Sequence, residues 1–568
     1  MAVLRCSPRH LPRESPRNMI TRSVCWILVL VLSASARAQS PAGQSGLVIH
    51  PVAQKASARP MSTRRSFPTP KRQGTVHVDL ATFRLPELER GRSRKVDRLL
   101  QLALFPDVLV DVHLTIAEKT SIGSVVWSGN VEHDPTSLVT IAIQDDGISA
   151  SISTGARKFV VRGNAAEAFE SVEITDDYPE DAEPIDVPAW GREVQKVTTE
   201  QDASNVADIL VVYTRAVRDR LGGTSATHAF VTEAIATTNA AYQSSGVVLR
   251  VRLAGALEVL YPESALAPAN PIVALDHITQ TADGMIDDVH QQRDIHGADA
   301  VAFLILGDNS SCGVAYRMTI PEPEFAPFAF SVSDVDCAVN NFSFAHELGH
   351  NFTLKHDRLN SAITSGAPYA YGYQDTEGQF RDIMAYAAGC SGAGRPCPRL
   401  AFFSNPQLMM SGRPAGVSAA FSNAADNRTA LNESAATIVN FRPSVAPPTV
   451  AGLAGTLDVD GNGRGDALTD GLLALRYLFG FRGNTLTANA IGGGATRSST
   501  AAIETHLATR LQSLDVTGNG TVDALTDGLL ILRHMFGFRG DTLTANAIGS
   551  GAIRTDPLAV ATYIESLK

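Results

Sequence analysis

The chain has 568 residues, of which 44% are hydrophobic and 19% charged, a composition typical of folded globular protein rather than of a disordered chain. At about 100–200 residues per domain, this length predicts several domains. The formal charge of −10 argues against nucleic-acid binding, which requires clustered positive charge.

The N-terminal segment has the pattern of a secretory signal. Ser23–Leu32 is an apolar run of about ten residues that follows a positive charge and precedes a small-residue exit at Ala36–Ala38. A membrane span needs about 20 apolar residues, so this run is too short for one. We therefore expect residues 1–38 to be a signal peptide and the protein to be secreted, with either Met1 or Met19 as the start. A buried core strand is the alternative for this run.

Four cysteines remain outside that signal, at Cys312, Cys337, Cys390 and Cys397. Export permits disulfides, and four cysteines allow three connectivities. Local pairing, Cys312 with Cys337 and Cys390 with Cys397, is favoured because each pair brackets a segment close to the motifs described below. A zinc–cysteine site is the alternative, although the sequence contains no C-x-x-C spacing.

Residues 39–200 show three patterns in succession. Residues 39–74 are rich in Ser, Ala, Pro, Gln and Arg without an apolar period, which predicts a flexible leader. Residues 75–175 contain short alternating apolar segments separated by Gly, Asp and Asn, which predicts an antiparallel β-rich unit. The acidic stretch 176–186 has no pattern that could form a core, and we expect a solvated, cleavable linker there.

The next segment, 201–443, alternates between strand and helix. Such alternation predicts an α/β layer. A Pro-rich linker is expected at 444–455, before a repeated segment at 456–568. The expected strands are 207–214, 247–261 and 298–306, and the expected helices are 228–246, which ends at Gly246, and 274–292.

The motif that indicates chemistry begins at His346 and Glu347 and continues to His350. On a helix, residues i and i+4 share a face about 5–6 Å apart, so the two histidines would donate nitrogens to one zinc ion at about 2.0–2.1 Å. Glu347 would lie beside the metal and take a proton from its water. His356 reaches the same ion only if the helix ends and the chain turns back. This spacing is typical of a zinc-peptidase helix, the alternative being a chance match.

A second motif, Asp382–Tyr386, contains Met384 and lies downstream of these histidines. Together the two motifs resemble the metzincin clan of zinc endopeptidases. Asp357, directly after the third histidine, resembles the reprolysin/adamalysin-like branch, and the surrounding sequence resembles its bacterial peptidyl-Asp metalloendopeptidase type over roughly residues 203–443. The resemblance implies an α/β catalytic domain with a mixed twisted sheet, an active-site helix and a Met-turn.

The resemblance also implies roles for single residues. Met384 would be an apolar floor under the histidines, and Asp357 would hydrogen-bond the chain near the Met-turn. Tyr386 would stabilise the oxyanion or swing onto zinc. An extended protein or peptide substrate would add antiparallel to an edge strand, by main-chain hydrogen bonds. That edge strand would contain Gly313, Val314 and Ala315.

Thr353 departs from the family pattern, which has Gly three residues after the second histidine. The glycine lets the helix turn sharply, whereas a left-handed backbone costs another residue about 1–2 kcal/mol. Either the turn is built differently or Thr353 is strained. The position of His356 depends on which of these holds.

Residues 39–200 would then be the propeptide of a zymogen. Because the sequence has no cysteine between residues 39 and 311, a cysteine cannot block the zinc from there. Inhibition would use a carboxylate, a histidine or steric cover. The alternative is a permanent β-rich accessory domain.

The C-terminal segment is duplicated, since Asp458–Gly463 recurs at Asp515–Gly520 and each copy continues into an apolar helix. It resembles EF-hand-like dockerin modules, which implies calcium sites and a surface or scaffold partner. The last acidic residue stands at position 13 of each loop rather than 12, and Thr517 replaces an acidic ligand; the alternative is a polar loop that caps a helix pair. The candidate calcium ligands are Asp458, Asp460, Asn462, Asp466, Asp470, Asp515, Asn519, Asp523 and Asp527.

We therefore predict a secreted zinc endopeptidase made as a zymogen. The alternative is a catalytically weakened, peptidase-like binding or adhesion protein with a calcium-dependent docking tail, and Thr353 is the residue that favours it. Bond preference is not readable from the sequence, because loops such as 387–402 form the pocket walls. A preference for acidic residues is implied only by the resemblance.

Overall fold

The computed structural model describes residues 48–52, 69–85, 87–154, 157–166, 168–187, 205–264, 267–375, 377, 379–390, 397–410, 412–443, 455–519, 521–549, 552 and 554–567. The expected signal peptide at 1–38 and all of the expected linker except Gly455 lie outside these residues, so both stay predictions. Among the described residues, no helix combines the length and apolar character needed to cross a membrane.

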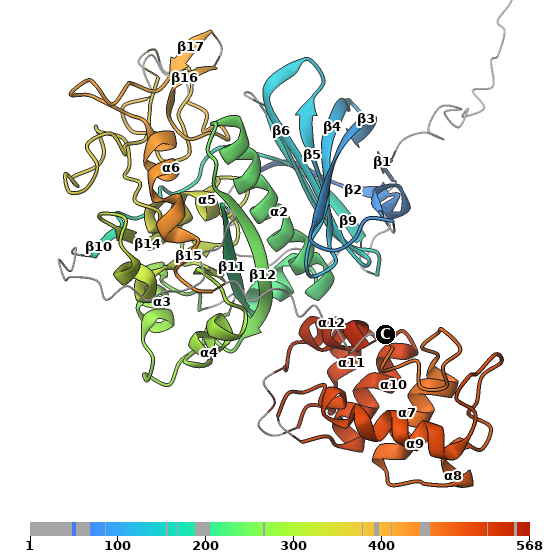
Figure 1. Ribbon diagram of the computed structural model, residues 1–568. Helices are drawn as coiled ribbons and strands as arrows, with labels where there is room; N and C mark the ends of the chain where they lie inside the picture. Colours follow the sequence, from blue (N-terminus) through green and yellow to red (C-terminus); the bar gives the residue numbers. More distant parts are fainter. Residues whose placement is uncertain are drawn as a thin grey trace, which may run out of the picture. The chain divides into compact units, whose positions relative to one another are not determined.

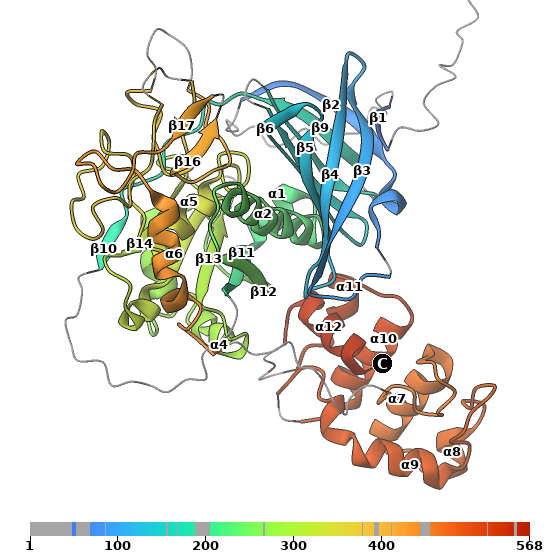
Figure 2. The same cartoon turned by 45° about the horizontal axis from the view of Figure 1, so that its top comes forward.

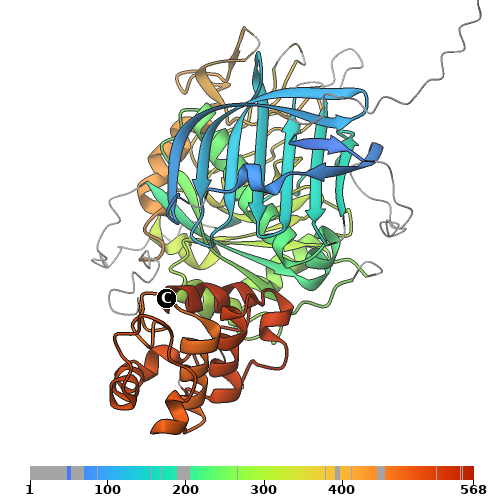
Figure 3. The same cartoon turned by 90° about the vertical axis from the view of Figure 1, so that its right-hand side faces the viewer.

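Nine strands near the N-terminus form one closed sheet, in the order β1-β2-β9-β8-β7-β6-β5-β4-β3, and Figure 3 shows them side by side. Trp127 lies in its core and donates its indole N–H to the carbonyl of Phe83 at 2.8 Å. A short 3-10 helix, Leu80–Phe83, follows β2. The strands are β1 (Ile49–Pro51), β2 (Pro70–Val78), β3 (Arg92–Phe105), β4 (Val108–Lys119), β5 (Val125–Val131), β6 (Asp134–Gln144), β7 (Gly147–Ser153), β8 (Lys158–Asn164) and β9 (Ala168–Ile174).

A second sheet of six strands has the order β10-β14-β15-β13-β11-β12. Its strands pair parallel except β14, which is antiparallel to β15. This mixed sheet, covered by helices, gives the α/β domain that the alternating pattern predicts. Its strands are β10 (Ile185–Val187), β11 (Val206–Thr214), β12 (Arg250–Val259), β13 (Ala300–Ile305), β14 (Gly313–Met318) and β15 (Phe330–Asp334).

Helix α2 (Thr224–Ser244) is buried on nearly all sides and lies between the two sheets (Figures 1 and 2). On the side of the first sheet, Glu233 accepts a hydrogen bond from Thr140 in β6 at 3.1 Å. A Cβ added at Gly147 in β7 would lie 2.5 Å from the backbone nitrogen of Ala226, so helix and strand are in direct contact. The helix also buries polar side chains, and Glu233 is hydrogen-bonded to both Thr140 and Ser149 of the first sheet, as a buried carboxyl requires.

The remaining helices of this region are short. The structure divides the single helix expected at 274–292 into two. The first ends where Gln280 turns extended, and the second begins after Gly284, whose φ of +79° is left-handed and incompatible with helix. The elements are α1 (Arg215–Leu221), α3 (Pro271–Thr279), α4 (Asp288–Ile295), a 3-10 helix (Pro323–Phe328), α5 (Ser343–Asn351), α6 (Asn427–Ile438), β16 (Asn405–Met410) and β17 (Arg413–Ala415).

Two expectations about the N-terminal half are wrong. The predicted leader, 39–74, contains β1 and the start of β2, which pair with each other antiparallel. The acidic stretch 176–186 is not a solvated linker, because Asp181 is 3% exposed and Ile185 begins β10 of the second sheet. The carboxylates of this stretch find buried cationic partners, a possibility that the local sequence pattern does not show.

The duplicated C-terminal segment forms a small helical unit with its own apolar core. The two copies pack through equivalent glycines. A Cβ at Gly471 would lie 3.0 Å from the sulfur of Met535, and one at Gly528 would lie 2.9 Å from a methyl carbon of Leu475. A π-helical turn precedes the main helix of each copy, at Ala467–Gly471 and Ala524–Gly528. The α-helices are α7 (Leu472–Leu478), α8 (Asn484–Thr487), α9 (Thr500–Thr509), α10 (Leu529–Met535), α11 (Asp541–Thr544) and α12 (Pro557–Leu567).

Candidate active site

Helix α5 carries the first two histidines of the motif and ends in a sharp turn at Thr353. The N–H of Leu354 donates to the carbonyl of Gly349 at 2.9 Å, and the N–H of Thr353 donates to that of His350 at 3.1 Å. This pair of bonds is a Schellman motif, which places its left-handed residue at Thr353. The φ of Thr353 is +85°, so the turn is built as in the family pattern and the threonine carries the strain.

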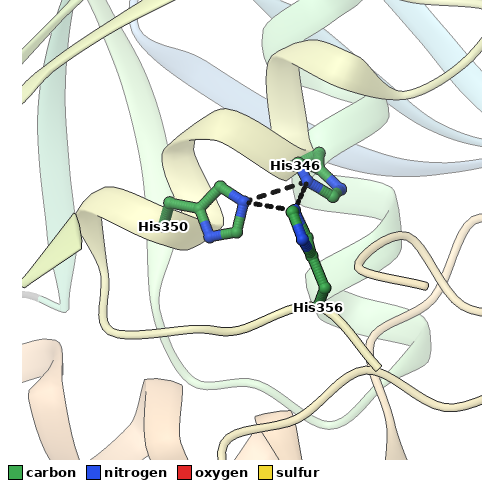
Figure 4. Close-up of side chains that lie close together, drawn as sticks. All are labelled: His346, His350 and His356. Atoms are coloured by element: carbon green, nitrogen blue, oxygen red, sulfur yellow. Dashed lines mark hydrogen bonds between the residues drawn. The ribbon is translucent and has the colours of Figure 1, made fainter. Parts of the chain in front are cut away.

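This turn brings His356 back beside the helix. The Nε2 atoms of His346, His350 and His356 lie 3.0–3.1 Å from one another, as the dashed lines in Figure 4 show. Thr353 therefore does not displace the third histidine, and the one residue that favours a degenerate scaffold loses its weight.

Backbone carbonyls orient two of the rings. The Nδ1 of His346 lies 2.8 Å from the carbonyl of Ile383, and the Nδ1 of His350 lies 2.9 Å from that of Leu354. An Nδ1–H that donates to a carbonyl leaves the Nε2 lone pair free, which is the usual arrangement of histidine ligands. Burial lowers the pKa of all three imidazoles, that of His356 to about 3, so the rings are neutral and able to bind a metal.

The donor set fits zinc. Three buried nitrogens with converging lone pairs repel one another unless a cation lies between them. Tetrahedral zinc with Zn–N bonds of about 2.0–2.1 Å spaces its ligands about 3.3 Å apart, close to the separations seen here. Three protein ligands leave the fourth position open, as catalytic zinc sites require.

Glu347 is fully buried next to these histidines, and both of its carboxylate oxygens lack a hydrogen-bond partner among the described residues. Gly313 of β14 makes room for it, because a Cβ there would lie 2.6 Å from Oε1 of Glu347. Burial and the neighbouring Asp181 raise the pKa of the Glu347 carboxyl. A buried, unpartnered carboxylate at this place is free to act on a reactant.

The Met-turn residues lie where the resemblance implies. Met384 is fully buried, and a Cβ at Gly349 would lie 2.8 Å from its sulfur, so it packs directly against α5. Asp357 accepts a hydrogen bond from the backbone N–H of Tyr386 at 3.0 Å, which joins the third histidine's loop to the Met-turn. The ring of Tyr386 lies 4.2 Å from that of His356, centroid to centroid.

Both local disulfides form. Cys312 bonds to Cys337, directly before β14 and after β15, and Cys390 bonds to Cys397 after the Met-turn. The first pair anchors the start of β14, and the second closes the loop that leads from Tyr386 to Arg399.

The segment before β10 runs through the site. The N–H of Ala182 donates to the carbonyl of Gly313 at 2.8 Å, and the N–H of Cys312 donates to that of Glu180 at 3.1 Å. The segment then continues as β10, parallel to β14, and Figures 1 and 2 both show β10 next to β14. The strand expected to receive substrate, β14, is therefore covered by the chain itself. The covering segment runs parallel to β14, whereas a substrate is expected to run antiparallel to it.

The carboxylates of this segment meet the site directly. Asp181 accepts a hydrogen bond from Arg399 at 2.9 Å, and both side chains are 0% exposed. A carboxylate oxygen of Glu183 lies 3.3 Å from Nδ1 of His356.

Farther along, Asp186 pairs with the fully buried Arg317 of β14 at 2.6 Å and accepts a hydrogen bond from Ser365 at 2.6 Å. None of these partners was singled out from the sequence. The acidic run at 176–186, placed before a catalytic unit that buries arginines, is the signal that could have indicated them.

The candidate calcium residues are only partly brought together. Asp458, Asp460 and Asp470 of the first copy place carboxylate oxygens within 4.8 Å of one another. The second copy has Thr517 in the place of Asp460, and its hydroxyl donates to Asp527 at 3.0 Å. Asp466 and Asp523 lie at the start of the π-helical turns, where their backbone N–H groups donate to the last aspartate of each loop at 2.9 and 2.8 Å. Asn462 and Asn519 each accept a hydrogen bond from a nearby backbone N–H, and Asp515 accepts one from Gly518.

A helix that supplies two histidines and a glutamate, a third histidine returned by a tight turn, and a methionine beneath them define a zinc metalloendopeptidase. The comparisons with known proteins agree. Residues 203–400 match the family model Reprolysin_5, Metallo-peptidase family M12. The chain is 32% identical over 326 residues to a peptidyl-Asp metalloendopeptidase of Stenotrophomonas maltophilia (strain R551-3), an alignment that covers 56% of this chain and 73% of that one. The chain belongs to this family of M12 metallopeptidases.

Two further similarities are weaker. A peptidyl-Asp metalloendopeptidase of Xanthomonas campestris pv. campestris is 26% identical over 452 residues, which cover 75% of this chain and 100% of that protein. The crystal structure of metalloproteinase-II from Bacteroides fragilis aligns with a TM-score of 0.30 and 10% identity, over 46% of this chain and 82% of that one. A score this low assigns no fold.

The strain at Thr353 generates a prediction. Thr353→Gly should raise the free energy of unfolding of the catalytic domain by about 0.5–1 kcal/mol, because relief of the left-handed strain exceeds the added backbone entropy of glycine. Calorimetry of the full chain, in a Glu347→Gln background that prevents self-digestion, measures the shift in Tm. Thr353→Ala keeps a Cβ and is the control, with a smaller gain. A glycine variant less stable than the alanine variant would contradict the strain.

Proposed function

We propose that the protein is a secreted endopeptidase, made as a zymogen, in which Glu347 is the general base at a zinc ion held by His346, His350 and His356. The observation that carries this proposal is the buried, unpartnered Glu347 carboxylate beside three converging imidazole nitrogens. Export is inferred from the signal-peptide pattern in the sequence of residues 1–38.

The mechanism follows from what surrounds the histidines. Zinc, when bound, supplies a Lewis acid that polarises the scissile carbonyl and acidifies water. Glu347 accepts the proton of the attacking water and passes it to the leaving amine. Gly313 keeps the space that this carboxylate needs. Met384 and Asp357 are proposed as structural residues that hold the Met-turn under the rings.

Tyr386 is proposed to donate to the developing oxyanion. Its hydroxyl donates to the backbone carbonyl of Asp181 at 2.5 Å, in the segment that crosses the site. A phenol that binds a main-chain carbonyl of an occluding segment is placed to bind the carbonyl of a substrate.

The zymogen proposal rests on the same segment. Residues 180–187 hydrogen-bond to β14 and place carboxylates next to His356 and Glu347, so substrate and this segment exclude each other. We propose the division 1–38 signal, 39–200 propeptide, 201–443 catalytic domain, 444–455 linker and 456–568 repeat unit. The two relatives are peptidyl-Asp metalloendopeptidases, and we propose that an aspartate beside the scissile bond is preferred here as well.

The C-terminal unit is proposed to bind calcium in its first loop and to dock to a surface or scaffold partner. Three carboxylates converge there, and the Oδ1 atom of Asp458 is buried without a hydrogen-bond partner among the described residues. Hard oxygen ligands at such spacing suit Ca²⁺. The loss of an acidic ligand at Thr517 predicts that the second loop binds more weakly.

Glu347→Gln should lower kcat for casein hydrolysis by about 10²–10⁴-fold and leave zinc content unchanged, because the amide cannot accept the proton while the histidines remain. Zinc is measured by mass spectrometry and hydrolysis by fluorescence, with and without a chelator. The exposed-site control Glu433→Gln should hydrolyse normally. A Glu347→Gln enzyme that cleaves at a rate near wild type would disprove the proposed mechanism.

Activation should coincide with cleavage between Val187 and Val206, since removal of residues 180–187 frees β14. Sequencing of the N-terminus of the active enzyme, together with a time course of activity, tests this. An active enzyme that retains residues 39–187 would show instead that the β-rich unit is a permanent accessory domain.

Ca²⁺ should raise the Tm of the C-terminal unit in the full chain, and Asp470→Asn should abolish that rise. Asp470 is one of the three converging carboxylates, and its oxygens also accept hydrogen bonds from the backbone N–H groups of Asp460 and Asp466 in the first loop. Calorimetry in calcium and in a calcium chelator measures it. Asp541→Asn, outside the loop, is the matched control and should respond as wild type. A calcium response that survives Asp470→Asn would exclude this site.

A further inference from the structure

Arg399 is a fully buried cation at the end of the catalytic site. It lies two residues after Cys397, where the N–H of Leu400 donates to the carbonyl of Arg381 at 3.0 Å and ties the segment to the Met-turn. The guanidinium of Arg399 is therefore held in a fixed position.

Among the described residues the guanidinium is hydrogen-bonded to the carboxylate of Asp181, and Glu180 is a more distant ion-pair partner at 3.9 Å. Nη1 donates to Asp181 at 2.9 Å and to the carbonyl of Asn341 at 2.9 Å, and Nη2 donates to the carbonyl of Ala385 at 3.4 Å. The Nε atom is buried without a partner among the described residues, as is Oδ1 of Asp181. The cation thus keeps a spare donor that a second carboxylate oxygen could use.

Asp181 occupies this position as a substrate residue would. Its carboxylate lies within 4.8 Å of ligand atoms of His346 and Glu347, and its backbone carbonyl accepts from the hydroxyl of Tyr386. Both the main chain and the carboxylate of Asp181 therefore lie next to the catalytic groups, and the carboxylate is bound there by Arg399. A residue next to the scissile bond of a bound peptide has the same two requirements.

Removal of the 180–187 segment takes the carboxylate of Asp181 away from Arg399, whose guanidinium keeps only its bonds to the carbonyls of Asn341 and Ala385 among the contacts named above. An unpaired buried charge is strongly unfavourable, and a substrate carboxylate restores the pair. A site built around such a group rejects ligands that leave it unpaired, so an amide or an apolar side chain binds poorly. The charge, more than the volume of the pocket, then decides which peptide is cleaved.

We propose that Arg399 selects an acidic side chain beside the scissile bond, and that Asp181 fills the same subsite before activation. This inference rests on the endopeptidase function proposed above and names the residue behind its preference. One side chain would thereby determine both which substrates enter and what holds the propeptide in place.

Three peptides identical except for Asp, Asn or Leu at one position test the specificity. The processed, zinc-loaded wild type should cleave the Asp peptide with kcat/KM at least ~100-fold above the other two. In Arg399→Met, kcat/KM should fall for the Asp peptide alone, so that the three peptides differ by no more than ~3-fold. Arg399→Lys should restore part of the preference for the Asp peptide. Arg413→Met, a change of the same chemistry at a pair with Asp375, is the control and should keep the ratio. An Arg399→Met enzyme that retains the ratio overturns the inference.

A synthetic peptide of residues 176–187 tests the shared subsite without any variant enzyme. It should inhibit the processed wild type, and the same peptide with Asp181→Asn should need at least ~10-fold more for equal inhibition. Equal potency of the two peptides overturns the inference even if Arg399→Met does not fold. If the wild type fails to cleave casein at all, the proposed function itself is wrong. If the wild type cleaves casein but cleaves the three peptides equally well, only the role of Arg399 is rejected.

Discussion

The site depends on one backbone constraint, the left-handed turn at Thr353. Helix α5 ends there, and the next three residues return His356 to within 3.1 Å of the two helical histidines. A continuous helix would carry His356 about 9 Å along its axis and leave a two-ligand site. Two main-chain hydrogen bonds hold the turn, and together they compensate the strain that a β-branched residue meets at a positive φ.

Two glycines allow the close packing around the histidines. Gly349 lets the sulfur of Met384 approach the helix, and Gly313 lets the carboxylate of Glu347 lie against β14. Each glycine is needed for space rather than for backbone freedom. Helix α5, the Met-turn and β14 are therefore in such close contact that a single methyl group at either glycine would shift one of them.

Ion pairs connect the acidic run 176–186 to the domain that contains the histidines. Asp181 and Asp186 each pair with a fully buried arginine, Arg399 and Arg317, so the acidic run is attached at two points. A buried ion pair adds little net stability, but removal of one partner is strongly destabilising because it leaves an unpaired buried charge. This arrangement is consistent with the proposal that the segment covers the site until it is cleaved and that the site then prefers an acidic side chain.

Much of this could be predicted from the sequence, because short-range spacing decides it. The i, i+4 histidines, the α/β alternation and the need for a turn before His356 follow from local spacing. The Met-containing motif was indicated by the resemblance, and the cysteine pairing was the favoured one of three connectivities. The break in the helix expected at 274–292 and the strands inside the expected leader were missed, since tertiary pairing overrides weak local patterns.

The sequence by itself indicated the proposed zinc ligands and the proposed general base, since these residues lie within a dozen positions of one another. Only the tertiary structure decided what the acidic stretch does. Asp181 and Arg399 are 218 positions apart. No periodicity relates two such residues. They meet because β10 joins the sheet beside β14, while the segment of Arg399 is bonded next to the Met-turn by the N–H of Leu400 and the carbonyl of Arg381.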